Sequence, residues 1–191
     1  MSAIFNPFSR IAGLKSLVWG LFFIISLTLL FAVSGIVQDG FLHFTLLDVA
    51  SWRVLTMNVV AWILFALPLY VGGVLLSHSK VRPVDVFGTL AFTQLLLIPM
   101  NLLLYVPSWR DSLNHVVANM LSGAMPQGGA MALVMAMGVW AIVWLVMFVM
   151  WGYNAFTTSC NVRGAKAVAI YIVAWVVATL VVPIFARWIC L

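Results

Sequence analysis

The polar side chains that could do chemistry inside the apolar stretches of this chain carry no charge. Four of them form a candidate polar patch: Asn58, Thr93, Gln94 and Asn101. An amide or a hydroxyl can hydrogen-bond to a neighbouring helix or to a polar ligand, but it neither gains nor loses a proton at neutral pH. Asn58 and Asn101 lie at similar distances from the ends of their apolar stretches. Antiparallel packing of the two stretches predicts that these amides meet.

This polar patch allows two interpretations. A hydrogen bond between helices in a membrane contributes roughly 0.6–2 kcal/mol, which would make the patch a helix-packing contact. Alternatively, it forms a polar vestibule for a lipid headgroup or a small solute. Proton-coupled pumps and charge-selective transporters usually need an ionisable residue inside the membrane. The predicted spans contain no Asp, Glu, Lys, Arg or His, which disfavours both classes.

The acidic and imidazole side chains lie mainly in the predicted outer connections, at Asp39, His43, Asp48, Asp111 and His115. No two of them have the spacing of zinc ligands, so we expect these side chains to be solvated and no metal or other cofactor to bind. The chain has only four acidic residues and three histidines, and this scarcity disfavours an enzyme.

A second candidate site lies in a short predicted inner connection, where Lys80, Arg82 and Asp85 come close together. Asp85 is placed to cap the following helix, while Lys80 and Arg82 can meet lipid headgroups or Asp85 itself. The alternative is a docking surface for a cytoplasmic partner.

The elements that position these residues follow from composition. Of the 191 residues, 65% are hydrophobic and only 7% are charged. The apolar residues form runs of about twenty, long enough to cross a bilayer as helices. We therefore predict an all-α integral membrane protein, a single domain over residues 1–191 with a bundle of five transmembrane helices. The predicted spans are residues 17–37, 54–76, 86–106, 130–151 and 167–186.

The outer connection at residues 107–129 has a helical pattern of its own. Ser108 and Asp111 have the spacing of a capping box, and apolar residues then recur at helical intervals until Gly123. This pattern predicts a short interfacial helix between the third and fourth spans.

The distribution of lysine and arginine predicts the orientation. One side would hold Arg10, Lys15, Lys80, Arg82, Arg163 and Lys166, and the other Arg53, Arg110 and Arg187. The excess places the N-terminus in the cytoplasm and the C-terminus in the periplasm or outside. The basic residues are scattered between apolar runs, so no nucleic-acid surface is predicted.

Two segments of the sequence resemble a known family. The first is Asp85-Val86-Phe87-Gly88-Thr89-Leu90-Ala91 followed by Leu97-Ile98-Pro99, and the second is Trp151-Gly152-Tyr153-Asn154-Ala155-Phe156 with Gly164-Ala165-Lys166-Ala167 after it. Both are similar to the Yip family of Ypt/Rab-interacting membrane proteins and their bacterial relatives. The resemblance implies five spans with a cytoplasmic N-terminus, and it implies membrane organisation without an established reaction. The family's Asp-Leu-Tyr-Gly-Pro stretch is missing, so GTPase binding is not carried over.

Together these patterns predict a non-enzymatic scaffold or organiser of Yip type in a bacterial inner membrane. Its expected partners are membrane lipid and either another membrane protein or a cytoplasmic protein. The alternative is a small transporter, channel or lipid-handling protein that uses the neutral patch between the second and third spans.

Overall fold

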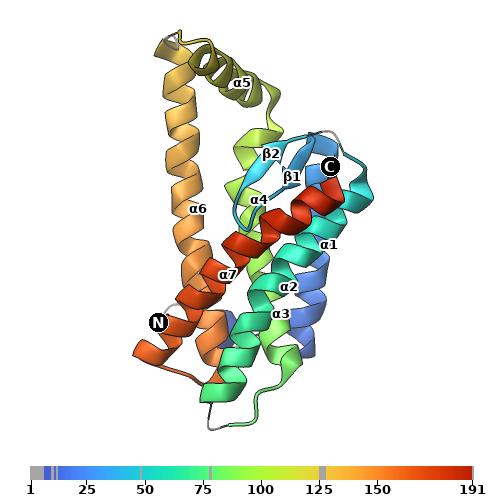
Figure 1. The fold of residues 1–191 in the computed structure, drawn as a ribbon, viewed down its shortest axis with the longest axis vertical. Helices are drawn as coiled ribbons and strands as arrows, with labels where there is room; N and C mark the ends of the chain where they lie inside the picture. Colours follow the sequence, from blue (N-terminus) through green and yellow to red (C-terminus); the bar gives the residue numbers. More distant parts are fainter. Residues whose placement is uncertain are drawn as a thin grey trace.

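The structure, a computed structural model, describes residues 7–9, 11, 13–47, 49–77, 79–124 and 128–190. Five helical segments in this part of the chain are long and apolar enough to cross a membrane, which confirms the predicted count. They are α1 (Leu14–Ser34), α2 (Ser51–Leu76), the segment Pro83–Met100 that begins with α3 (Pro83–Thr93), α6 (Gly128–Cys160) and α7 (Ala165–Cys190). The connection between α2 and α3 and the connection between α6 and α7 lie at one end of the molecule, called the inner end below, and the opposite end is called the outer end (Figure 1).

The third segment is shorter and less regular than the predicted helix at 86–106. After α3 the chain forms a 3-10 turn, η2 (Gln94–Leu96), then α4 (Leu97–Met100) and a second 3-10 turn, η3 (Leu102–Tyr105). Pro99 contributes to this irregularity because it has no backbone N–H to donate. The 3-10 turn η2 begins at Gln94 and ends before Asn101, so the two residues are not part of one regular α-helix.

The helix predicted in the outer connection is present as α5 (Pro107–Leu121), but its start differs from the prediction. Val106 precedes the helix and Pro107 is its first residue, a position that suits proline because the first N–H of a helix has no partner there. The Ser108 capping box is therefore wrong. The guanidinium of Arg110 donates to the carbonyl oxygen of Leu104 at 3.0 and 3.2 Å, which ties α5 to η3.

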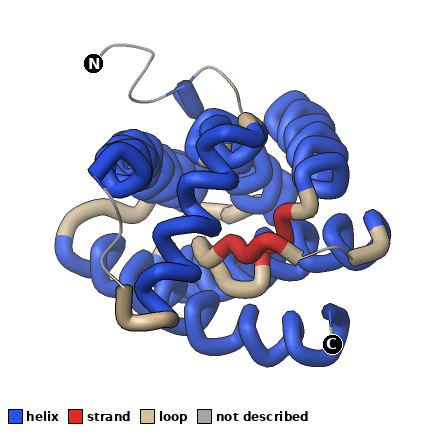
Figure 2. Tube along the Cα trace, turned by 90° about the horizontal axis from the view of Figure 1, so that it is seen from above, coloured by secondary structure: helices blue, strands red, loops and turns tan. Residues whose placement is uncertain are grey.

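The fold is mainly helical, as predicted, but the short β-hairpin between α1 and α2 is not predicted from the sequence. Strand β1 (Ile36–Gln38) pairs antiparallel with β2 (Phe44–Leu46), and Val37 lies opposite Thr45. Seen from above, the strands lie within the group of helices (Figure 2). α1 stops just before β1, at Gly35, whose φ of 61° is in the left-handed region that glycine adopts easily.

Small residues allow the helices to approach closely. A Cβ atom on Gly20 of α1 would meet the backbone of Ala91 and Phe92 in α3. A Cβ atom on Gly72 of α2 would meet Ile170 of α7. Because a side chain at either position would push two helices apart, these glycines set the distances between α1 and α3 and between α2 and α7.

Helix α6 differs from the other long helices because little of its apolar surface is covered by the rest of the molecule. In the most apolar 18-residue stretch of α6, only 6% is buried inside the molecule, whereas the corresponding value is 33% for both α1 and α2. Its outer half carries α5 at its tip (Figure 1). The buried part of α6 is at its inner half, where Phe148, Ala155 and Phe156 are fully covered.

Candidate functional site

The tip of the hairpin lies deep among the helices. Phe41, at the turn between β1 and β2, is only 3% exposed. The centroid of its ring lies 4.5 Å from that of Phe65 in α2, 5.0 Å from that of Trp175 in α7 and 6.3 Å from that of Phe148 in α6. One aromatic side chain of the hairpin thus joins three helices, and the three contacts fix its level.

Phe41 contacts the three helices at similar distances from their inner ends. Phe65 is 76 − 65 = 11 residues from the inner end of α2, Trp175 is 175 − 165 = 10 residues from that of α7, and Phe148 is 160 − 148 = 12 residues from that of α6. At about 1.5 Å per residue these separations are roughly 15–18 Å. The contacts of Phe41 therefore fall at similar positions along three helices.

The turn satisfies much of its own hydrogen bonding. Gln38 is 2% exposed, and its Nε2 donates to the carbonyl oxygen of Phe41 at 2.6 Å. The backbone N–H of Gly40 donates to the carbonyl oxygen of His43 at 3.3 Å. A Cβ atom on Gly40 would lie 2.8 Å from the Cβ of His43, so the tight turn excludes a larger residue at that position.

The turn also carries a pair of ionisable side chains. Nδ1 of His43 lies 2.6 Å from Oδ1 of Asp39, an ion pair when the imidazole is protonated. Asp39 and His43 are each two residues from Phe41. Because two residues of extended chain span at most about 7 Å, their Cα atoms lie within that distance of the Phe41 Cα atom. The residues that connect α1 and α2 therefore form a hairpin that packs against the helices.

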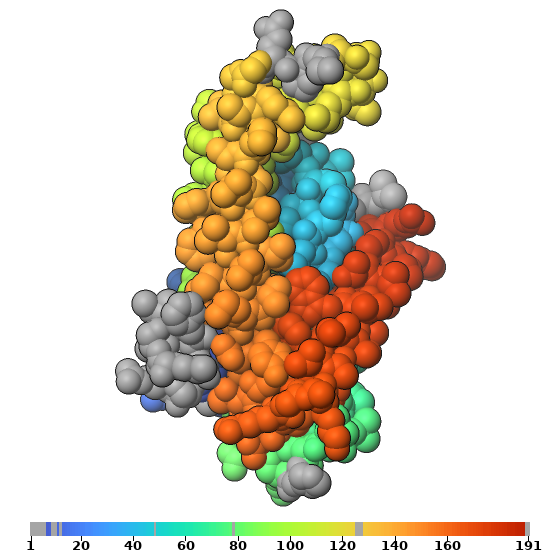
Figure 3. Space-filling model, turned by 90° about the vertical axis from the view of Figure 1, so that its left-hand side faces the viewer, coloured from blue at the N-terminus to red at the C-terminus, as the bar shows by residue number. Residues whose placement is uncertain are grey.

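Two cavities flank the hairpin. The α6-side cavity, of about 310 Å³, lies between the hairpin, α4, η3, α5 and α6. The α7-side cavity, of about 290 Å³, lies between the hairpin and the outer end of α7. In a space-filling view the hairpin reaches the molecular surface between α6 and α7 (Figure 3).

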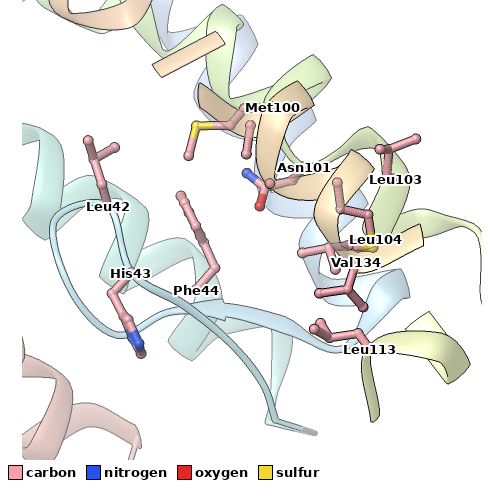
Figure 4. A pocket seen from close by; sticks show the side chains of 12 residues that line it. Leu42, His43, Phe44, Met100, Asn101, Leu103, Leu104, Leu113 and Val134 are labelled. Carbon is pink, nitrogen blue, oxygen red and sulfur yellow. The ribbon is translucent and has the colours of Figure 1, made fainter. Parts of the chain in front are cut away.

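The α6-side cavity is mainly apolar. Its walls include Leu42, Phe44, Met100 and Met137, and Asn101 is the amide among its lining residues. Figure 4 shows Phe44 and Met100 facing each other beside the Asn101 amide, whereas the ring of His43 points away from that amide. This cavity could therefore accept an apolar chain with one hydrogen-bonding group.

The α7-side cavity is more polar and contains opposite charges. Its charged residues are Asp39 from the hairpin and Arg187 from the last turn of α7, and Thr45 adds a hydroxyl. Val37 and Pro183 supply apolar walls. In the described part of the chain, neither Arg187 nor the Thr45 side chain forms a hydrogen bond or ion pair. Both groups are therefore available to a ligand.

The predicted polar patch does not form one site. Asn58 is buried, and its Nδ2 donates to Oγ1 of Thr28 in α1 at 3.0 Å, while its Oδ1 is buried without a hydrogen-bond partner. The Nδ2 atom of Asn101 donates to the carbonyl oxygen of Leu97, four residues earlier in the chain, at 2.9 Å. The predicted hydrogen bond between the two amides is therefore wrong, because α1 supplies the partner of Asn58.

The other two members of the patch are also buried. The hydroxyl of Thr93 donates to the carbonyl oxygen of Leu90, one turn earlier. Gln94 is 3% exposed and begins η2, outside the lining of either hairpin cavity. Of the four predicted residues, Asn101 is the one that lines a hairpin cavity.

The predicted inner contact site at Lys80, Arg82 and Asp85 does not form a paired cluster. Both basic side chains are exposed, and no ion pair joins them to Asp85 within the described residues. Arg82 precedes α3 and Pro83 opens it, so the capping role predicted for Asp85 is wrong. Its carboxylate instead lies in the first turn, where a negative charge is favourable beside the helix dipole.

The sequence does contain a signal for the hairpin that the periodicity of the spans obscured. Asp39-Gly40 stands between Ile36-Val37 and Phe44-Thr45, and an Asp-Gly pair between apolar residues is a strong hairpin signal. A second sign is that Gly35 precedes the first strand. The acidic and histidine side chains of the described residues include no group of three that could hold a metal ion.

No protein-family model matches the chain, and it matches no curated protein and no solved structure. The resemblance to the Yip family therefore stays a prediction from the sequence.

Proposed function

We propose that the chain is an integral protein of a bacterial inner membrane, that α1, α2, the segment Pro83–Met100, α6 and α7 cross the bilayer, and that the hairpin re-enters it from the outer side. Measured along the helices, the residues that contact Phe41 lie roughly 15–18 Å from the inner ends, and a roughly 30 Å hydrocarbon core has its middle at about 15 Å. The inner end carries Lys15, Lys80, Arg82, Arg163 and Lys166, which supports a cytoplasmic location for that end.

Within this membrane protein we propose a non-enzymatic lipid-handling role, in which a lipid headgroup moves beside the hairpin. The observation that carries this proposal is the contact of Phe41 with Phe65, because it brings the irregular backbone of the turn between the helices, with Asp39 and His43 two residues away on either side. Such backbone is tolerated in a bilayer only when buried in protein or beside a water-filled cavity. Ionisable groups inside a membrane usually mark a path for a polar species.

The sideways exposure of the hairpin favours lipid over a water-soluble substrate. The side chain of His43 is 72% exposed, and the hairpin reaches the surface between α6 and α7 (Figure 3). A headgroup could enter this opening from the side while its acyl chains stay in the bilayer. The apolar walls of the α6-side cavity suit the neighbouring hydrocarbon.

Transfer of fluorescent phospholipid between leaflets of proteoliposomes tests the role. We expect the purified chain to accelerate transfer and the double variant Asp39→Leu with His43→Leu to abolish the acceleration, because it removes the polar pair from the hairpin. Asn114→Leu with Asn119→Leu, on the outer helix α5, is the control and should keep the wild-type rate. Circular dichroism and elution volume would verify that each variant is folded.

Transfer no faster than in protein-free liposomes, at every protein density, would contradict lipid handling. In that case the Yip-type scaffold expected from the sequence becomes the better proposal. Transfer that survives removal of the pair would contradict the part assigned to the hairpin.

A further inference from the structure

The α7-side cavity presents two opposite charges to whatever enters it. Asp39 and Arg187 both line this cavity, yet they do not form an ion pair with each other. Arg187 belongs to the last turn of α7, at the outer end, whereas Asp39 lies near the hairpin tip. A ligand with a positive and a negative group would satisfy both without bringing them together.

The carboxylate of Asp39 retains capacity for such a ligand. Its Oδ1 contacts His43, and a carboxylate has about four acceptor positions on its two oxygens. Its side chain is 32% exposed. A primary ammonium group has three donors and matches these remaining acceptors.

The guanidinium of Arg187 offers the complementary group. Five N–H donors in a planar arrangement suit a phosphate, which they bind through two parallel hydrogen bonds. The hydroxyl of Thr45 lines the same cavity and can donate to another phosphate oxygen. The apolar residues Val37 and Pro183 complete the walls.

We infer that the α7-side cavity binds a phosphoethanolamine headgroup, with its primary ammonium at Asp39 and its phosphate at Arg187. The headgroup enters amine first, since Asp39 is the deeper of the two charges. This inference rests on the proposed lipid-handling role and names the class of lipid. Phosphatidylglycerol lacks the ammonium, and the quaternary amine of phosphatidylcholine has no N–H to donate to a carboxylate.

Lipid retention tests the assignment. The full-length protein is extracted from vesicles that contain phosphatidylethanolamine, phosphatidylglycerol and phosphatidylcholine in equal amounts, and the retained lipids are counted by native mass spectrometry. We expect enrichment of phosphatidylethanolamine. Asp39→Asn and Arg187→Gln should each reduce that enrichment about tenfold or more, the loss typical of one charge-assisted hydrogen bond.

Matched variants separate recognition from folding. Asp111→Asn on α5 and Arg163→Gln at the inner end remove the same charges outside the cavity and should leave retention unchanged. His43→Gln removes the ion pair but keeps the Asp39 carboxylate, so enrichment should persist. Loss of enrichment in His43→Gln as large as in Asp39→Asn would show that hairpin geometry, not ammonium binding, is responsible, and it would overturn the assignment.

Competition with a water-soluble headgroup tests whether the ligand is the intact lipid or the free headgroup. Free phosphoethanolamine should fail to displace the retained lipid at concentrations comparable to that of the lipid, and efficient displacement would overturn the lipid as the ligand. Equal retention of the three lipids, with leaflet transfer intact, would overturn the headgroup assignment and leave the proposed function standing. Absence of both retention and transfer would contradict the two together.

Discussion

The ring of Phe41 lies 4.5 Å from the ring of Phe65, centroid to centroid, and this contact joins a β-turn to the middle of a long apolar helix. Trp175 lies 5.0 Å from the same ring on the α7 side. The hairpin is therefore held by aromatic packing at its tip as well as by its two short strands. Phe44 of β2 adds a second aromatic contact, 5.5 Å from Phe31 of α1 between ring centroids.

Phe41→Ala should destabilise the protein strongly. Removal of a fully packed phenylalanine costs about 3–5 kcal/mol, because the transfer energy is lost and a cavity remains. Thermal unfolding in detergent measures the change. Phe185→Ala is the matched control, since Phe185 is 42% exposed and should lose little. Equal melting temperatures for the two variants would show that Phe41 does not anchor the hairpin.

The hydrogen bond between Asn58 and Thr28 should be measurable as a coupling between α1 and α2. A double-mutant cycle with Asn58→Leu and Thr28→Val should give about 0.6 kcal/mol, and no more than about 1.7 kcal/mol, as for other hydrogen bonds between membrane helices. The same cycle with Asn58→Leu and Asn101→Leu should be additive. Coupling in the second cycle but not in the first would restore the contact predicted from the sequence.

Gly20 should not tolerate a side chain, because a Cβ atom there would meet the backbone of α3. Gly20→Val is expected to separate α1 from α3 and to cost about 1–3 kcal/mol through overpacking. Gly138→Ala in α6 is the control, since open space surrounds that position. Thermal unfolding in detergent measures the stability of the two variants, and we expect a loss of stability in Gly20→Val but not in Gly138→Ala. A Gly20→Val protein as stable as wild type would contradict the close crossing.

The sequence predicted the helices well and the hairpin poorly, for a physical reason. Runs of about twenty apolar residues have one stable solution in lipid, so the five long segments could be located from composition alone. The position of the hairpin depends on which helices surround Phe41, and that arrangement is a property of the tertiary structure. Its local signal, Asp39-Gly40, was confined to a few residues between two long apolar runs.

The same distinction explains the candidate site. Neutral amides within spans were visible in the sequence, but their partners depend on helix order and rotation. Asn58 turned towards Thr28 of α1, and Asn101 towards the hairpin. The polar pair Asp39–His43 was assigned to an outer connection because nothing in its composition indicates that the connection folds inward.

The depth of the hairpin in a bilayer tests the central claim most directly. A spin label at position 43, in a variant with both native cysteines replaced by serine, reports depth through its relative accessibility to oxygen and to a water-soluble nickel complex. Labels at two exposed positions provide the references. Val146 on α6 lies two residues from Phe148, and Asn114 lies on the outer helix α5.

We predict that the label at position 43 reports a depth well inside the membrane, much closer to that of Val146 than to that of Asn114, with nickel access limited to the cleft. A depth equal to that of Asn114, with full access to the nickel complex, would place the hairpin outside the bilayer and contradict the account.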